Sequence, residues 1–140
     1  MCEEFDGGYQ GALLLAGAEV LAFECFGSYQ GDWLAKVRIN GQIRWVHDYF
    51  GSCSYCDAFE HDLGGKFEHS CADNRYHNPV YRGFTSGCAQ CQKAKEAIGE
   101  FGKRYLEDAV EFDEVRSQVV KNAEWDMDAQ KMVTWLDEHR

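Results

Sequence analysis

Four cysteines in two closely spaced pairs are the residues of this sequence best suited to chemistry. Cys53 and Cys56 form one Cys-x-x-Cys pair, and Cys88 and Cys91 form a second one after 31 intervening residues. Two residues between paired cysteines let both thiolates reach one ion from a tight turn, and zinc prefers four such ligands in a tetrahedron. The spacing therefore predicts one structural zinc ion bound by Cys53, Cys56, Cys88 and Cys91.

The segment between the two pairs offers further ligands. It is longer than the roughly 15–20 residues common between such pairs, and it contains His61, His69, Cys71 and His77. Because each of these side chains can ligate zinc, the fourth ligand stays open between cysteine and histidine, with His69 and Cys71 as substitutes. A thiol–disulfide function is the alternative for a Cys-x-x-Cys pair before a helix, but the expected elements lack its usual βαβ context.

The remaining cysteines suggest no chemistry of their own. Cys2 and Cys25 are isolated in the sequence, and we expect both to be small buried residues. No signal peptide or membrane-spanning segment is recognisable, so we expect a cytoplasmic protein in which thiols stay reduced.

The segment from Cys53 to Lys95 also resembles zinc-stapled HNH nucleases. Those enzymes place a histidine, a Gly-Gly turn and an asparagine between two Cys-x-x-Cys pairs, with lysines after the second pair. The matching residues between and after the two pairs are His61-Asp62, Gly64-Gly65, Asn74 or Asn78, and Lys93 and Lys95. The resemblance implies that His61 activates water and that a later histidine holds a catalytic metal, which makes His61, His77 and Asn78 the alternative catalytic residues. Only four residues separate Cys56 from His61, which is too few for the strand that these nucleases have between the two positions. A nuclease is therefore the second hypothesis.

The net charge of −10 restricts the partners of this chain. A strongly acidic surface repels phosphate backbones, so direct nucleic-acid binding is disfavoured and a basic protein partner is favoured. The excess is largest in residues 106–140, which contain 10 acidic and 4 basic residues. The candidate partner-binding residues are Glu107, Asp108, Glu111, Asp113, Glu114, Glu124, Asp126 and Asp128.

Strands are expected in the first half of the chain, at residues 20–26, 33–39 and 43–50, which are rich in β-branched and aromatic residues. Asn40-Gly41 is typical of a hairpin turn. Because register follows the buried face, we expect a three-residue connection or a bulge that places Val37 on the same face as Trp45. A weak internal repeat indicates an earlier hairpin over residues 13–26, with a short helix at 13–15 as the alternative.

Helices are expected in the second half, behind an irregular stretch at residues 51–87. Apolar residues recur at three- and four-residue steps in three segments. They are Cys91, Ala94, Ile98, Phe101, Tyr105 and Ala109; then Phe112, Val115 and Val119; then Ala129, Met132, Val133 and Leu136. Ser86 or Gly87 is expected to cap the first helix, and Asp126 or Asp128 the third.

These elements predict an α+β fold in one domain, residues 1–140. An N-terminal antiparallel β-meander of three to four strands, within residues 1–50, packs against two to four C-terminal helices within residues 89–140. A zinc-stapled loop region, residues 51–91, lies between them.

A Gly-Ser-Cys-Ser-x-Cys-Asp box at residues 51–57 follows the expected hairpin. With Tyr29-Gln30-Gly31-Asp32-Trp33 upstream, this box resembles a family of uncharacterised small proteins common in phage and bacterial genomes. The resemblance covers residues 28–60 well and residues 89–106 loosely. It implies an origin in a mobile element, and it implies no activity.

Taken together, these features favour a non-enzymatic, acidic, zinc-binding interaction protein. For a phage-borne gene, we expect an inhibitor of a host nucleic-acid-handling defence complex, of the anti-CRISPR or anti-restriction type, in which acidic side chains occupy a basic channel. The alternatives are the HNH-like nuclease and a housekeeping structural zinc module of a larger assembly.

Overall fold

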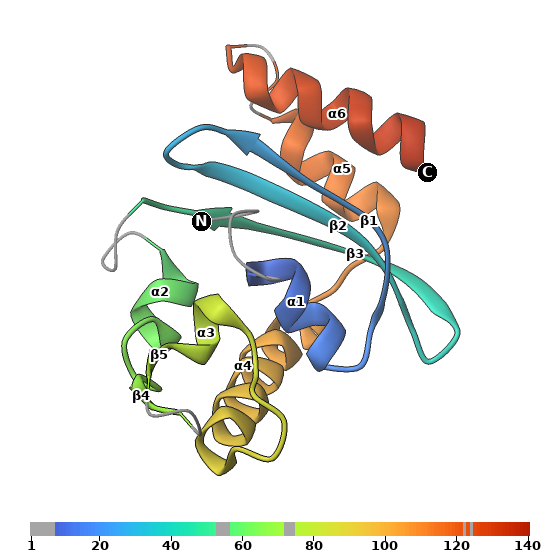
Figure 1. The fold of residues 1–140 in the computed structure, drawn as a ribbon. Coiled ribbons are helices and arrows are strands. Elements are labelled where there is room, and N and C mark those ends of the chain that lie inside the picture. The colour runs from blue at the N-terminus through green and yellow to red at the C-terminus, as the bar shows by residue number, and fades with distance from the viewer. Residues whose placement is uncertain (1–7, 53–56, 72–74, 122, 124) are drawn as a thin grey trace.

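The centre of the fold is a three-stranded antiparallel sheet with the strand order β1-β2-β3 (Figure 1). The structure, a computed structural model, describes residues 8–52, 57–71, 75–121, 123 and 125–140. The strands are β1 (Glu19–Gly27), β2 (Gly31–Ile39) and β3 (Gln42–Phe50), and helix α1 (Gly8–Leu15) precedes them. A β-meander followed by helices confirms the predicted α+β class.

Short elements and three longer helices follow the sheet. The short elements are α2 (Ala58–Leu63), β4 (His69–Ser70), β5 (Tyr76–His77) and α3 (Pro79–Arg82). The longer helices are α4 (Ala89–Glu107), α5 (Phe112–Val120) and α6 (Met127–His139). Helices α5 and α6 cover one face of the sheet, whereas α1 and α4 lie on the other side (Figure 1). The short elements gather beside α4.

Each face of the sheet has its own hydrophobic core. Trp33, Ala35, Val37, Val46 and Phe50 belong to the core that includes residues of α1, α2 and α4. On the opposite face, Phe26, Leu34 and Trp45 pack against α5 and α6. Because both faces are covered, the strands bury residues of both alternating sets.

This two-sided burial explains why the predicted hairpin register is wrong. The strands β2 and β3 pair Ile39 with Gln42 and Val37 with Arg44, which leaves a two-residue loop. Asn40 and Gly41 both have positive φ angles, 51° and 80°, as a type I′ turn requires. Consequently Val37 and Trp45 lie on opposite faces, since each face has apolar residues of its own to bury.

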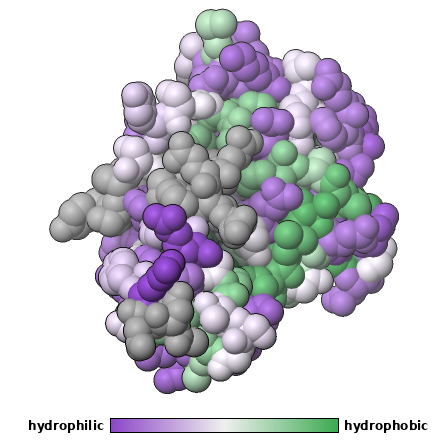
Figure 2. Space-filling view, viewed as in Figure 1, coloured by the Kyte–Doolittle hydropathy of each residue, from purple (hydrophilic) through white to green (hydrophobic). Residues whose placement is uncertain are grey.

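Residues 8–15 form a helix and not the first strand of the predicted earlier hairpin. Ala12 and Leu13 are buried in the core shared with α4, whereas Leu14 and Leu15 are partly exposed. Figure 2 shows a band of hydrophobic surface over α1 and the adjoining part of β1, which includes Leu14, Leu15 and Leu21. The alternative of a short helix at residues 13–15 is confirmed.

The helical stripes of the second half are confirmed. Cys91, Ala94, Ile98 and Phe101 are buried along α4, and Val115 and Val119 along α5. Asp126 caps α6 and accepts hydrogen bonds from the backbone N–H groups of Asp128 and Ala129. The N-cap of α4 is Cys88 and not Ser86 or Gly87.

Asp57, the last residue of the Gly-Ser-Cys-Ser-x-Cys-Asp box, fastens the middle region to the first core. Its buried carboxylate accepts hydrogen bonds from the Tyr9 hydroxyl at 2.7 Å, the Gly51 N–H at 3.0 Å and the Glu60 N–H at 2.9 Å. The last of these bonds caps α2. One side chain thus joins α1, the end of β3 and α2.

We expect Asp57→Ala to lower the free energy of unfolding by about 3–5 kcal/mol, because it leaves three donors without their charged acceptor. Tyr9→Phe removes only one of these bonds and should reduce stability by about 1–2 kcal/mol. Urea denaturation of the two variants measures the difference. A loss from Asp57→Ala no larger than that from Tyr9→Phe would contradict this role of the carboxylate.

Candidate metal centre

A two-stranded hairpin positions the first two candidate ligands. His69 lies on β4 opposite His77 of β5, and the Cys71 N–H donates to the Arg75 carbonyl at 3.0 Å, which extends the pairing by one residue. Side chains two residues apart on an extended strand point to the same side. Because His69 and Cys71 have this spacing, the hairpin presents an imidazole and a thiol together.

The start of α4 positions the other two candidate ligands. Cys88 is the N-cap residue, and Cys91 lies in the first turn. Residues three apart on a helix lie on the same face, and the positive end of the helix dipole favours a thiolate there. Cys91 is buried and Cys88 is half-buried.

The four ligand atoms converge on one point. The sulfur and nitrogen atoms of His69, Cys71, Cys88 and Cys91 all lie within 4.8 Å of one another. Nε2 of His69 lies 3.3 Å from the Cys88 sulfur and 3.7 Å from the Cys91 sulfur, and the sulfurs of Cys71 and Cys91 are 3.8 Å apart. A tetrahedral zinc ion separates two sulfurs by about 3.8 Å and a sulfur and a nitrogen by about 3.6 Å. The measured distances fit such an ion.

Surrounding groups orient these ligands. Nδ1 of His69 donates to the Phe67 carbonyl at 2.8 Å, which leaves Nε2 facing the sulfurs. Metal-binding histidines characteristically donate a hydrogen bond in this way from the ring N–H that does not face the metal. The Cys71 sulfur lies 3.0 Å from the Thr85 hydroxyl, its hydrogen-bond partner. The site is therefore preorganised beyond its four ligand atoms.

The electrostatics of the cluster make metal binding depend on pH. The backbone N–H of Cys91 and the His69 ring lower the pKa of the Cys88 thiol to about 6. The hydrogen bond to the Phe67 carbonyl raises the pKa of His69 to about 9, and burial raises the pKa of Cys91. A cation that binds here displaces the protons of His69 and Cys91, so binding weakens as the pH falls.

Two of the four predicted ligands, Cys88 and Cys91, belong to this cluster. The other two positions are filled by His69 and Cys71, which the sequence named as substitutes. Cys53 and Cys56 lie outside the described residues, and their assignment as ligands stays a prediction. The i, i+2 spacing of His69 and Cys71 brings two side chains to the same side of a strand, but no pattern in the sequence predicts that strand.

The residues of the nuclease hypothesis have other bonds. His61 is exposed on α2 beside Asp62, and Nε2 of His77 donates to the Gly83 carbonyl at 2.8 Å. The Asn78 side chain caps α3 and donates to the Gly64 carbonyl at 2.7 Å. Among the described residues, His61 and His77 belong to no cluster of metal-ligating side chains. Within the part of the chain that the structure describes, no hydrogen bond or ion pair joins His61 to His77 or Asn78, and Asn74 lies outside the described residues.

Several of the predicted partner-binding acids are engaged within the chain. Glu111 forms an ion pair with Arg44, Asp113 forms one with Arg140, and Asp126 caps α6. Acidic residues near helix N-termini are stabilised by the helix dipole, which gives part of this cluster a structural explanation. Glu107, Asp108, Asp113 and Glu114 are exposed and Asp128 is half-buried, whereas Glu124 lies outside the described residues.

Cys25 differs from its expectation as a small buried thiol. It is half-buried on β1 and is disulfide-bonded. Cys71, Cys88 and Cys91 form no disulfide, so none of them is its partner.

Comparisons with protein-family models, with curated proteins and with solved structures find no match to this chain. No helix among the described residues is both long and apolar enough to span a membrane. The class of site is therefore defined by its geometry alone: three thiols and one imidazole that can hold a metal ion.

Proposed function

We propose that this protein is a non-enzymatic interaction protein whose fold is held by one structural zinc ion. The observation that carries the zinc assignment is the convergence of His69, Cys71, Cys88 and Cys91 within 4.8 Å. Four protein ligands complete a tetrahedron and leave no position for water or substrate, which distinguishes structural from catalytic zinc sites. Three sulfurs and one imidazole also select zinc over the oxygen-seeking cations.

The ion would join two segments that are separate in the sequence. The β4–β5 hairpin supplies His69 and Cys71, and the start of α4 supplies Cys88 and Cys91. β4 and β5 consist of two residues each, which is too short for a stable hairpin in isolation. A bound ion supplies the free energy that this small sheet lacks, and it fixes the connection that leads into α4.

The proposed partner is a basic protein surface, specifically that of a host complex that handles nucleic acid. The net charge of −10 supports this assignment, as do the exposed acids at the start of α5. The Asp113 side chain is 90% exposed, although it forms an ion pair of 3.7 Å with the exposed Arg140. In its specific form, the proposal is that a mobile element encodes this chain as an inhibitor of a host defence complex. Acidic side chains of the inhibitor would then occupy a channel built for nucleic acid.

The charge proposal is tested by affinity capture from a host lysate at increasing salt. We expect a basic nucleic-acid-handling complex to bind the wild-type chain and to dissociate as salt rises, because the attraction is screened. The double variant Asp113→Lys/Glu114→Lys should lose at least about tenfold of the captured complex. Glu96→Lys/Glu100→Lys, an equal change in charge on the exposed side of α4, should retain it. Equal capture by both variants would count against an acidic docking surface on α5.

A further inference from the structure

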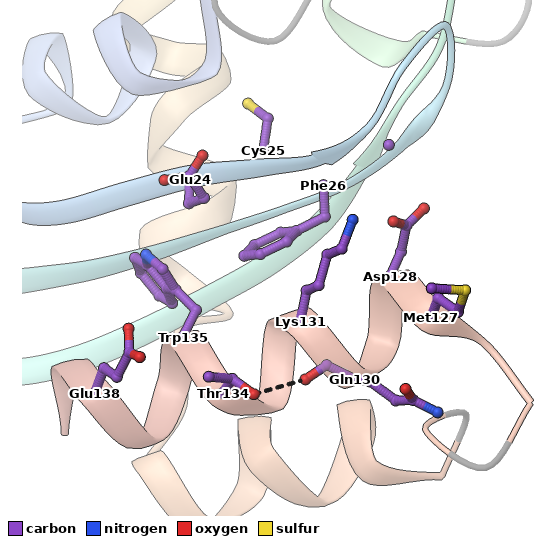
Figure 3. A pocket seen from close by; sticks show the side chains of 11 residues that line it. Glu24, Cys25, Phe26, Met127, Asp128, Gln130, Lys131, Thr134, Trp135 and Glu138 are labelled. Atoms are coloured by element: carbon purple, nitrogen blue, oxygen red, sulfur yellow. Dashed lines mark hydrogen bonds between the residues drawn. The ribbon is translucent and has the colours of Figure 1, made fainter.

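A groove of about 570 Å³ lies between strand β1 and helix α6, and none of the four metal-cluster residues lines it. Phe26 and Trp135 form its floor; both are buried, and their ring centroids lie 6.2 Å apart in an edge-to-face contact. Lys131 extends from α6 toward β1 between Phe26 and Asp128 (Figure 3). The groove therefore combines an apolar floor with charged walls.

One wall of the groove is an edge strand. Among the described strands, β1 pairs only with β2, which makes it an edge of the described sheet. Its pairing with β2 is regular from Ala22 to Gly27 and irregular between Val20 and Ala22. The regular part includes the residues that border the groove, Glu24 to Gly27. Extended peptides bind such sites by adding a strand to the edge and placing alternate side chains in the adjacent pocket.

Carboxylates dominate the charge of the groove. Its lining includes Glu24, Asp128 and Glu138 but only one cation, Lys131. None of these four side chains forms an ion pair with another described residue. Glu24 and Glu138 lie at the same end of the groove, and Met127 and Asp128 lie at the other end (Figure 3). This charge attracts a cationic segment and disfavours pairing with a second copy of the acidic chain.

We propose that the groove binds an extended, basic segment of the partner, added as a fourth strand beside β1. An apolar side chain of the segment lies over Phe26 and Trp135. An arginine or lysine two residues away lies between Glu24 and Glu138, because alternate residues of a strand share one face. This inference rests on the proposed function, since it names the segment by which a basic partner is recognised.

The test uses a fluorescein-labelled peptide with threonine at every second position. Leucine occupies its central position, and an arginine lies two residues from the leucine on each side. We expect the full-length chain to bind this peptide, and its NMR amide signals to shift along residues 22–27 and along α6. The matched control peptide carries N-methyl groups on alternate threonines. It keeps its charge but lacks the backbone N–H donors of those threonines, and its Kd should be higher by about tenfold or more.

Variants of the groove separate this site from general charge attraction. Glu24→Lys reverses the charge of one side chain in the β1 wall of the groove. Thr134→Arg places a larger, positively charged side chain at an exposed position in the α6 wall. We expect each change to raise the Kd of the peptide by about tenfold or more. Glu96→Lys alters the net charge as Glu24→Lys does but lies on α4, and it should change the Kd by less than about threefold. Thermal melting followed by circular dichroism shows that each variant is folded.

Several results would overturn strand addition at β1. They are an absence of peptide binding, equal Kd values for the N-methylated and unmodified peptides, equal effects of Glu24→Lys and Glu96→Lys, and amide shifts confined to α5. None of these results bears on the salt-sensitive capture of a basic complex, so the two proposals fail separately.

Discussion

Cys88→Ser should abolish metal binding by this protein and release the β4–β5 hairpin from α4. The wild-type chain should bind one zinc ion, and the variant should bind less than about a tenth of an equivalent at the same zinc concentration. The reason is that serine is a poor zinc ligand and that the remaining three groups must leave water in the fourth position. Apparent binding free energies of about 10–16 kcal/mol for structural zinc leave room for a large loss.

Elemental analysis of the purified chain measures the stoichiometry, and limited proteolysis measures the release of the hairpin. We expect cleavage within residues 64–87 to increase in Cys88→Ser and in wild-type protein treated with a chelator. A chelator should lower the melting temperature of the wild type but leave that of Cys88→Ser unchanged. Wild-type protein that binds no zinc even after reconstitution under reducing conditions would refute a structural zinc site.

The same measurement decides between the two possible ligand sets. His69→Ala and Cys71→Ser should lose zinc as Cys88→Ser does, because each removes a member of the cluster. Cys53→Ser and Cys56→Ser should keep one equivalent. Zinc lost in Cys53→Ser, Cys56→Ser and Cys88→Ser but kept in His69→Ala and Cys71→Ser would restore the set predicted from the two Cys-x-x-Cys pairs.

The ligand set shows which metal ligands can be predicted from the spacing of residues in the sequence. Cys-x-x-Cys is a recognisable pattern because both thiolates must come from one tight turn, and Cys88-x-x-Cys91 fits that rule at the start of α4. His69 and Cys71 satisfy the same requirement differently, through the two-residue period of an extended hairpin. That hairpin has only two residues in each strand, so no run of alternating apolar residues marks it in the sequence. The sequence identified His69 and Cys71 as available ligands, but it contained no signal for the hairpin that positions them.

The sheet shows a second limit of the sequence. Val37 and Trp45 are both buried, and a rule based on one buried face aligns them on the same side. In the structure they belong to two different cores, because helices cover both faces. The positions of the strands follow from local composition, whereas the register depends on helices that lie later in the chain. The Asn40-Gly41 turn, taken alone, indicates the observed two-residue loop.

The close approach of α1 to α4 depends on one glycine that no sequence pattern singled out. A Cβ atom on Gly102 would lie 2.0 Å from the Ala12 carbonyl oxygen, whereas one on Gly99 would lie 3.2 Å from the Leu15 carbonyl oxygen. The first distance is impossible without a shift of one helix, and the second requires a displacement of a few tenths of an ångström. Because α1 contributes Tyr9, Ala12 and Leu13 to the core, a shift of α1 disturbs the packing around Trp33.

Gly102→Ala should therefore lower the free energy of unfolding by about 3 kcal/mol or more, which is the upper range for overpacked cores. An alanine in an unobstructed helix is instead about 1 kcal/mol more favourable than glycine. Gly99→Ala combines this gain with a small steric conflict and should change stability by less than about 1 kcal/mol. Urea denaturation of the two variants, each measured with its zinc bound, compares two equal changes three residues apart on one helix. If Gly102→Ala proved as stable as Gly99→Ala, α1 would be free to move away from α4, and the close backbone contact would not hold the first core together.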